Sequence, residues 1–208
     1  MFSQDNMEQV ELATEAIDKY IEYRENKSFQ KNLLCELCHC ISIGISIWCG
    51  HTYIGEQKDP NELLIYQGFF YKLSILICTI ERNSARSDQE ELRFLESIKY
   101  NGTIFRYLGS SNHSNHDRIY PIPDSQYVSW TKDKDMIYPY ISQKLYGPIT
   151  LISYNIGEND FGIDLIGFYE YCRSDEIRVL WDCREFENEV VYRTPKISDE
   201  NISIIEEA

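Results

Sequence analysis

Three carboxylates alternate in the stretch "EFENEVVY", residues 185–192, and this spacing is suited to chemistry on one side of a strand. Successive side chains of an extended segment point to opposite faces, so Glu185, Glu187 and Glu189 would project together. Carboxylates held side by side can move a proton or stabilise a positive charge that develops at a reacting carbon. The simpler alternative is the solvated face of an acidic strand whose other face is packed.

Two further polar features lie in strand-like segments upstream. Arg106 stands inside the apolar run "IFRYLG", where a guanidinium needs an anion or a place at the edge of the sheet. Ser129 and Thr131 alternate in "QYVSWT" and would share one face of a strand. Each feature also has an ordinary reading, as a rim arginine paired with a carboxylate or as common strand chemistry. Their order along the chain is what makes them informative together.

Taken in this order, the three segments resemble the R-S-E class of mono-ADP-ribosyltransferases. That family carries an aromatic residue and Arg on one strand, a Ser-x-Ser or Ser-x-Thr strand end, and a Glu-x-Glu followed by apolar residues. The matching residues are Phe105-Arg106, Ser129-Trp130-Thr131 and Glu187-Asn188-Glu189-Val190-Val191. The resemblance covers the C-terminal half of the chain.

The resemblance implies a set of catalytic roles with NAD as co-substrate and no metal. Arg106 would hold the diphosphate through its fork of donors, and Ser129 would hold the ribose and support the last Glu. Glu189 would accept a hydrogen bond from the 2′-hydroxyl of the nicotinamide ribose and so stabilise the forming oxocarbenium. Glu187 would orient or deprotonate the acceptor. Contacts with NAD are expected from Arg106, Tyr107, Ser129, Trp130, Thr131 and Tyr138, with Tyr140 as an alternative to Tyr138 for stacking on nicotinamide.

Two alternatives stay open within the resemblance. The pair Glu185 and Glu187 has the same spacing as Glu187 and Glu189, although only the second pair runs directly into apolar residues. Tyr107 stands where the family usually has Gly, which would crowd the backbone near the nucleotide. This departure favours a second hypothesis, a catalytically degenerate interaction protein that binds a partner through an acidic face.

The resemblance also suggests acceptors and partners. Glu at the first position of Glu-x-Glu, here Glu187, accompanies arginine or nucleic-acid acceptors in the family. Small bacterial members of this kind are often toxins of antiphage toxin-antitoxin systems, including one type that modifies messenger RNA and is held by an antitoxin and a chaperone. The expected acceptor is therefore RNA or a protein side chain.

The bulk composition is that of a folded protein, with 43% hydrophobic and 26% charged residues among 208. A formal net charge of −14 argues against general binding to nucleic acid or anionic membranes and leaves room for a basic partner. The sequence has no continuous run of 18 apolar residues, and its N-terminus is acidic and polar. We expect a soluble cytoplasmic chain that does not bind membranes.

The cysteines raise the question of a metal site. Seven cysteines is an odd number, which is consistent with reduced thiols in a cytosol. Cys35, Cys38, Cys40 and His51 could supply four zinc ligands. However, no second pair follows at finger-like spacing, and the segment is periodic like a helix, so we favour buried structural thiols.

The order of expected elements predicts an α+β fold, with a helical part over 1–100 and a sheet-rich catalytic part over 101–208 in one compact domain. Helices are expected near residues 5–26, 29–48, 63–81 and 88–100, the last capped by Ser87 or Asp88. Strands are expected at 103–109, 126–131, 148–156, 177–183 and 186–192, the last of these ending the sheet. A short helix is expected at 133–147, and 160–172 is ambiguous. The helical part would pack on a small mixed or antiparallel split sheet of ADP-ribosyltransferase type.

Overall fold

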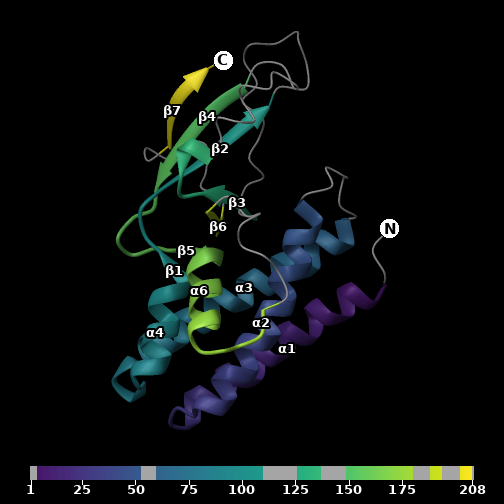
Figure 1. The fold of residues 1–208 in the computed structure, drawn as a ribbon, viewed down its shortest axis with the longest axis vertical. Coiled ribbons are helices and arrows are strands. Elements are labelled where there is room, and N and C mark those ends of the chain that lie inside the picture. The colour runs from purple at the N-terminus through teal and green to yellow at the C-terminus, as the bar shows by residue number, and fades with distance from the viewer. Residues whose placement is uncertain are drawn as a thin grey trace. The chain divides into compact units, whose positions relative to one another are not determined.

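The protein is an α+β chain in which the helices come first and most strands follow (Figure 1). The computed structural model describes residues 4–52, 60–109, 126–136, 149–179, 188–193 and 202–207. Glu185, Glu187, Tyr138 and Tyr140 lie outside these residues. The mixed class predicted from the sequence is confirmed, and the sheet pairings given below are antiparallel.

The chain divides into two compact units, which are described separately. The helical unit contains Met1–Lys99 and Gly167–Phe186, and the sheet unit contains Tyr100–Ile166 and Glu187–Ala208. The boundary between Lys99 and Tyr100 lies next to residue 101, where the sheet-rich part was expected to begin. Residues 167–186 differ from the expected division, since they belong with the helices and not with the sheet.

The helical unit is built on three long helices, followed by shorter elements. Its helices are α1 (Gln4–Asn26), α2 (Lys31–Thr52), α3 (Pro60–Arg82), the 3-10 turn η1 (Ser84–Arg86), α4 (Gln89–Ile98) and α6 (Leu165–Ser174). The first two residues of α6, Leu165 and Ile166, belong to the sheet unit. The four expected N-terminal helices are therefore confirmed. Helix α4 begins where the side chain of Asp88 accepts hydrogen bonds from the amides of Glu90 and Glu91, as the cap signal predicted.

Aromatic side chains fill much of the interior of the helical unit. Trp48 of α2 packs edge-on against Tyr66 and Phe70 of α3, with ring centroids 5.3 and 5.1 Å apart. Helix α6 belongs to this unit because the rings of Phe168 and Tyr171 pack against Phe94 of α4, with ring centroids 6.1 and 5.7 Å apart. This apolar face explains why 167–186 leave the sheet unit, an arrangement that the mixed pattern of 160–172 did not reveal.

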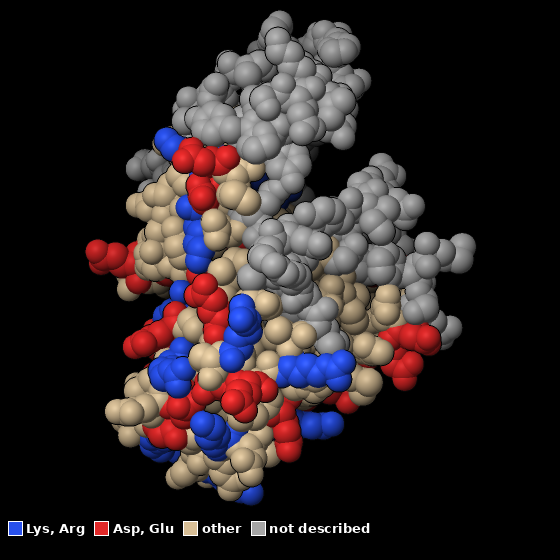
Figure 2. Space-filling model, in the orientation of Figure 1, with Lys and Arg blue, Asp and Glu red and all other residues tan. Residues whose placement is uncertain are grey.

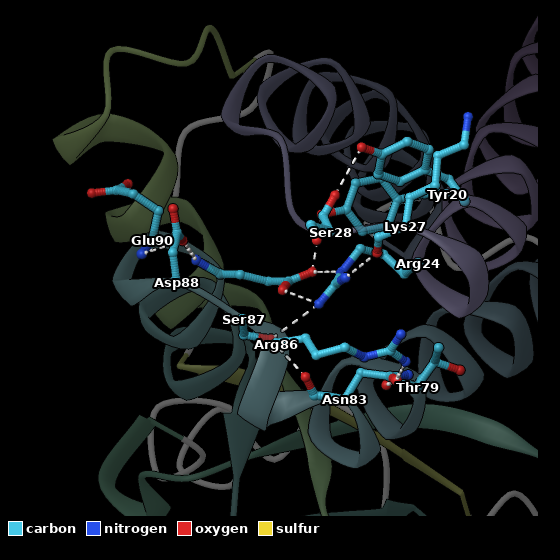
Figure 3. A network of polar contacts seen from close by, with 12 residues as sticks. Tyr20, Arg24, Lys27, Ser28, Thr79, Asn83, Arg86, Ser87, Asp88 and Glu90 are labelled. Carbon is cyan, nitrogen blue, oxygen red and sulfur yellow. Dashed lines mark hydrogen bonds and ion pairs between the residues drawn. The ribbon is translucent and has the colours of Figure 1, made fainter.

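A buried ion pair joins α1 to α4 inside the same unit (Figure 3). Nε and Nη2 of Arg24 donate to the two carboxylate oxygens of Glu91 at 2.6 and 2.8 Å, and neither side chain is exposed. The hydroxyl of Tyr20 donates to the same carboxylate at 3.0 Å, and Nη2 also reaches Ser87. The pair is thus satisfied on both sides, as a buried charge must be.

The sheet has seven strands in the order β1-β5-β6-β3-β2-β4-β7. They are β1 (Lys99–Tyr100), β2 (Thr103–Gly109), β3 (Tyr127–Thr131), β4 (Ile149–Asn155), β5 (Gly162–Asp164), β6 (Glu189–Arg193) and β7 (Ile202–Glu207), with a 3-10 turn η2 (Lys134–Met136) after β3. Four of these match the expected strands, whereas residues 177–179, the described part of the strand expected at 177–183, do not form a strand. Of the helix expected at 133–147, the structure describes residues 133–136, where the 3-10 turn η2 lies. The segment of residues 186–192 was wrongly expected to end the sheet, because β7 follows it and pairs with β4.

One face of the sheet carries an apolar cluster of alternating side chains. The cluster consists of Ile104, Trp130, Ile152, Tyr154, Ile156, Val190 and Tyr192, with Tyr100 and Val128 packed against it. Tyr154 and Tyr192 stack at 5.4 Å, and the hydroxyl of Tyr192 donates to Asp160 at 2.7 Å. Burial, followed by the hydrogen bonds of its hydroxyl with the hydroxyl of Tyr154 and with Asp160, raises the pKa of Tyr192 well above its usual value.

Candidate functional site

The three motif segments lie on neighbouring strands, although they are far apart in the sequence. Strand β3 is flanked by β6 on one side and β2 on the other. Thr131 is the cross-strand partner of Glu189 on β6 and of Phe105 on β2. The sheet therefore brings the arginine, serine and glutamate motifs side by side.

Ser129 connects Arg106 to Glu189 through two different atoms. Nη1 of Arg106 donates to the main-chain carbonyl oxygen of Ser129 at 2.5 Å. The hydroxyl of Ser129 donates to Oε1 of Glu189. Since only 7% of Glu189 is exposed, this hydroxyl is one of the groups that satisfy a nearly buried carboxylate.

The sheet is interrupted at the seam where Arg106 lies. Among the described residues, strand β2 pairs with β4 along its whole length, from Thr103 to Gly109, but pairs with β3 at Phe105 and Thr131 alone. The guanidinium bonds a strand carbonyl of β3 beside this seam. The guanidinium of Arg106 thus donates to a carbonyl oxygen of β3, a type of acceptor that a backbone amide of the neighbouring strand bonds in a regular ladder.

The Cα–Cβ bonds of Arg106 and Glu189 point to opposite faces of the sheet. Arg106 alternates with Phe105 and shares the face of Ile104, which belongs to the apolar cluster. Glu189 alternates with Val190, which belongs to the same cluster, so its Cα–Cβ bond points to the other face. The guanidinium and the carboxylate therefore meet through Ser129 and not across one face.

The other predicted site residues differ in their surroundings. Thr131 is 6% exposed, and its hydroxyl oxygen accepts a hydrogen bond from the amide of Asp133 at 3.1 Å. Trp130 is 3% exposed and lies in the apolar cluster, away from Ser129, and its Nε1 has no acceptor among the described residues. The backbone of Tyr107 pairs with Leu151 in the β2–β4 ladder. Glu187 and Tyr138 fall outside the described residues.

The structure corrects the picture of one extended acidic face. Asn188 has a φ of 52°, in the left-handed region, and β6 begins only at Glu189. A strand requires negative φ throughout, so the alternation that was expected from Glu185 to Glu189 does not pass through Asn188. The expectation of one regular strand is therefore wrong at Asn188, whereas the choice between the two Glu-x-Glu pairs stays a prediction.

A second polar group near the motif strands was missed at the sequence level. Nζ of Lys132 bonds Oδ2 of Asp164 on β5 at 2.7 Å and lies 5.7 Å from the ring centre of Tyr100. Burial, and then the charge of Asp164, raises the pKa of Tyr100. Nothing in the local sequence pairs these residues, because the contact depends on β5 and β3 both flanking β6.

The thiols of the cysteine-rich segment differ in their surroundings. Cys38 is completely buried in α2, and burial, followed by a hydrogen bond with Cys172 of α6, raises the pKa of its thiol. Cys35 and Cys40 are partly exposed. Within the described ranges, no three His, Cys, Asp or Glu side chains gather closely enough to hold a metal ion.

Comparison with known proteins provides no relative for this arrangement. No family model, curated protein or solved structure matches the chain. The site must therefore be interpreted from its own geometry. Chemically, it offers a nearly buried carboxylate, a hydroxyl that holds it, and a guanidinium bonded to the same serine.

Proposed function

We propose that this protein is an NAD-dependent ADP-ribosyltransferase that transfers ADP-ribose to a macromolecular acceptor. The observation that carries the proposal is the connection of Arg106, Ser129 and Glu189 across β2, β3 and β6. The resemblance rests on motif order alone, and in support of it the three motif strands are neighbours in the sheet, although the side chains of Arg106 and Glu189 leave opposite faces. The interrupted seam between β2 and β3 also agrees with the split sheet expected of that enzyme type.

In the proposed reaction, the bond between nicotinamide and ribose breaks, and its electron pair leaves with nicotinamide. The acceptor nucleophile then bonds to the same ribose carbon and loses its proton. Glu189 would stabilise the positive charge on the ribose, and its hydrogen bond from Ser129 would hold it in place. Arg106, which donates to the carbonyl oxygen of Ser129, would hold the diphosphate.

The assignment of the remaining roles follows the same proposal. Glu187 would deprotonate or orient the acceptor, and Tyr107, Thr131 and Tyr138 would contact NAD. Trp130 would act from the packed side of β3, as a support for Ser129. No metal takes part in these steps.

The acceptor in this proposal is RNA or a protein side chain, in the cytoplasm of a cell that uses the protein as a defence toxin. An antitoxin and a chaperone would be its partners. On the face shown in Figure 2, acidic and basic side chains alternate over the described surface. With a net charge of −14, an RNA acceptor would be contacted locally and not along an extended basic track.

The test is NAD cleavage and transfer by the purified protein. We expect the wild type to release nicotinamide from NAD and to label protein or RNA in a cell extract, with the ADP-ribose mass found on the acceptor. Glu189→Gln should lower both rates by about a hundredfold or more, because it removes the charge that stabilises the transition state. The matched control is Glu158→Gln, an exposed glutamate of the sheet unit, which should leave both rates unchanged.

A second candidate is a non-enzymatic interaction protein. The opposite directions of the Cα–Cβ bonds of Arg106 and Glu189, and the low exposure of Glu189, favour a structural role for this carboxylate. In that case, the folded wild type would neither hydrolyse NAD nor transfer ADP-ribose. Glu189→Gln would then change only the stability of the sheet unit.

A further inference from the structure

The start of β6 is held by an unusual residue. Asn188 has a φ of 52°, and among the described residues other than glycine only Glu176, with a φ of 58°, shares this region. Asparagine tolerates the left-handed conformation better than other residues with a β-carbon, and β-branched residues tolerate it least. The chain turns at Asn188 immediately before the carboxylate of Glu189.

Asn188 is tied to the end of β3 by its main chain and its side chain. Its carbonyl oxygen accepts from the amide of Lys132 at 3.1 Å, and its Nδ2 donates to Oδ2 of Asp133 at 3.4 Å. Asp133 is itself fixed, because its amide donates to Oγ1 of Thr131 at 3.1 Å and its Oδ1 accepts from the amide of Asp135 at 3.0 Å. Thr131 is the cross-strand partner of Glu189, so these bonds surround the first pair of the β3–β6 ladder.

We infer that Asn188 and Asp133 form a clamp that positions the carboxylate of Glu189 for catalysis. The inference rests on the proposed function for its kinetic consequence. Asn188 is a positioning residue that acts through Glu189, since its left-handed turn and its bond to Asp133 fix where β6 begins.

The clamp predicts an order among substitutions at one position. Asn188→Gly loses the bond to Asp133 but adopts the turn easily, so its effect should be small. Asn188→Val should resist the turn strongly, because a β-branched side chain is most crowded there. Asp133→Ala removes the acceptor of Asn188 and of the Asp135 amide, and we expect an intermediate effect.

The experiment measures nicotinamide release by the full-length variants below their unfolding temperatures. Asn188→Val should lower kcat by about tenfold or more, since small displacements of a catalytic group have effects of this size. The KM for NAD should change by less than about twofold, since Asn188 acts through Glu189. Asn188→Gly should keep kcat within about threefold of the wild type on the same grounds. Wild-type kcat in folded Asn188→Val would overturn the inference, as would a change confined to KM.

Glu176 offers a matched control for the backbone cost alone. It has the same φ and lies in the helical unit, after α6. Glu176→Val should therefore lower the unfolding temperature much as Asn188→Val does and leave kcat unchanged. Equal losses of kcat in both variants would show a general loss of stability and would overturn the positioning role.

A second readout separates this inference from the proposed function. If the wild type does not cleave NAD, the proposed function fails, and the clamp is tested by NMR titration of the Glu189 carboxyl in protein labelled at glutamate side chains. Asn188→Val should shift the pKa of Glu189, whereas Asn188→Gly and Glu176→Val should not. An unchanged titration in Asn188→Val would overturn the clamp irrespective of activity.

Discussion

At the scale of single residues, the helical unit contains a completely buried ion pair. Arg24 and Glu91 are fully buried and form a two-pronged ion pair in the helical unit (Figure 3). Nη1 of Arg24 also donates to the carbonyl oxygen of Lys27 at 2.8 Å. Removing one partner would leave the other charge without compensation in an apolar interior.

We therefore expect Arg24→Met to lower the free energy of unfolding by roughly 3 to 5 kcal/mol, the usual effect of breaking a buried pair. Glu91→Gln should have a similar effect, because it leaves the guanidinium without a counter-charge. Chemical denaturation measures both. The double variant should lose less than the sum of the two, since neither charge then remains buried alone.

The control is the pair of Lys19 and Glu15 on the outer side of α1. Its atoms are 3.7 Å apart, and the side chains are 78% and 63% exposed. Lys19→Met should change the free energy of unfolding by about 0 to 1 kcal/mol, as for other surface pairs. A loss from Arg24→Met that is no larger than this would contradict the assigned role of the buried pair.

At the scale of elements, the packing of α2 on α3 depends on a glycine. A β-carbon added to Gly44 of α2 would lie 2.7 Å from two ring atoms of Phe69 on α3. Phe69 is fully buried, so its ring has little room to move. The ring of Phe69 can therefore pack against α2 at this point because residue 44 has no side chain.

Gly44→Ala should destabilise the protein, because overpacking a core costs about 1 to 3 kcal/mol, which exceeds the gain in helix propensity. The matched control is Gly68→Ala on α3, where no atom lies within 4 Å of the added carbon. That variant should raise stability by about 0.5 to 1 kcal/mol through helix propensity alone. Thermal unfolding compares them, and equal effects would contradict the close contact.

At the scale of the whole molecule, two helices are long and apolar enough to cross a membrane by length and composition. They are Lys31–Cys49 of α2 and Asn61–Arg82 of α3, of which 50% and 44% are buried within the protein. Such helices are weak evidence, because core helices of soluble proteins pass the same test. Both pack against α1, which carries exposed carboxylates such as Glu8, Glu11 and Glu15.

We expect the protein to stay in the supernatant when cell lysates are centrifuged at high speed. A bilayer position for α2 and α3 would require the charged face of α1 to enter lipid, which is costly. The contrary result is a pellet that resists alkaline carbonate and releases the protein only in detergent. If the wild type pellets but the double variant Leu64→Gln, Tyr71→Gln stays in the supernatant, the exposed apolar side chains of α3 cause a surface association.

The sequence by itself determined the α+β class, the long helices and the strands that carry the motifs. Helices depend on contacts three and four residues apart and on local caps, so the periodic apolar positions and Asp88 were sufficient to place them. The alternating pattern likewise predicted β2, β3 and most of β6.

Only the tertiary structure decided how these pieces meet. Strand order is set by contacts between residues far apart in the chain, so no local pattern could place β3 between β2 and β6. The residue type of Asn188 permits a left-handed turn, but the bonds to Lys132 and Asp133 are what fix it there. The proposed partners of Glu189 therefore follow from pairing across the sheet, and not from the alternation of acids in residues 185–189.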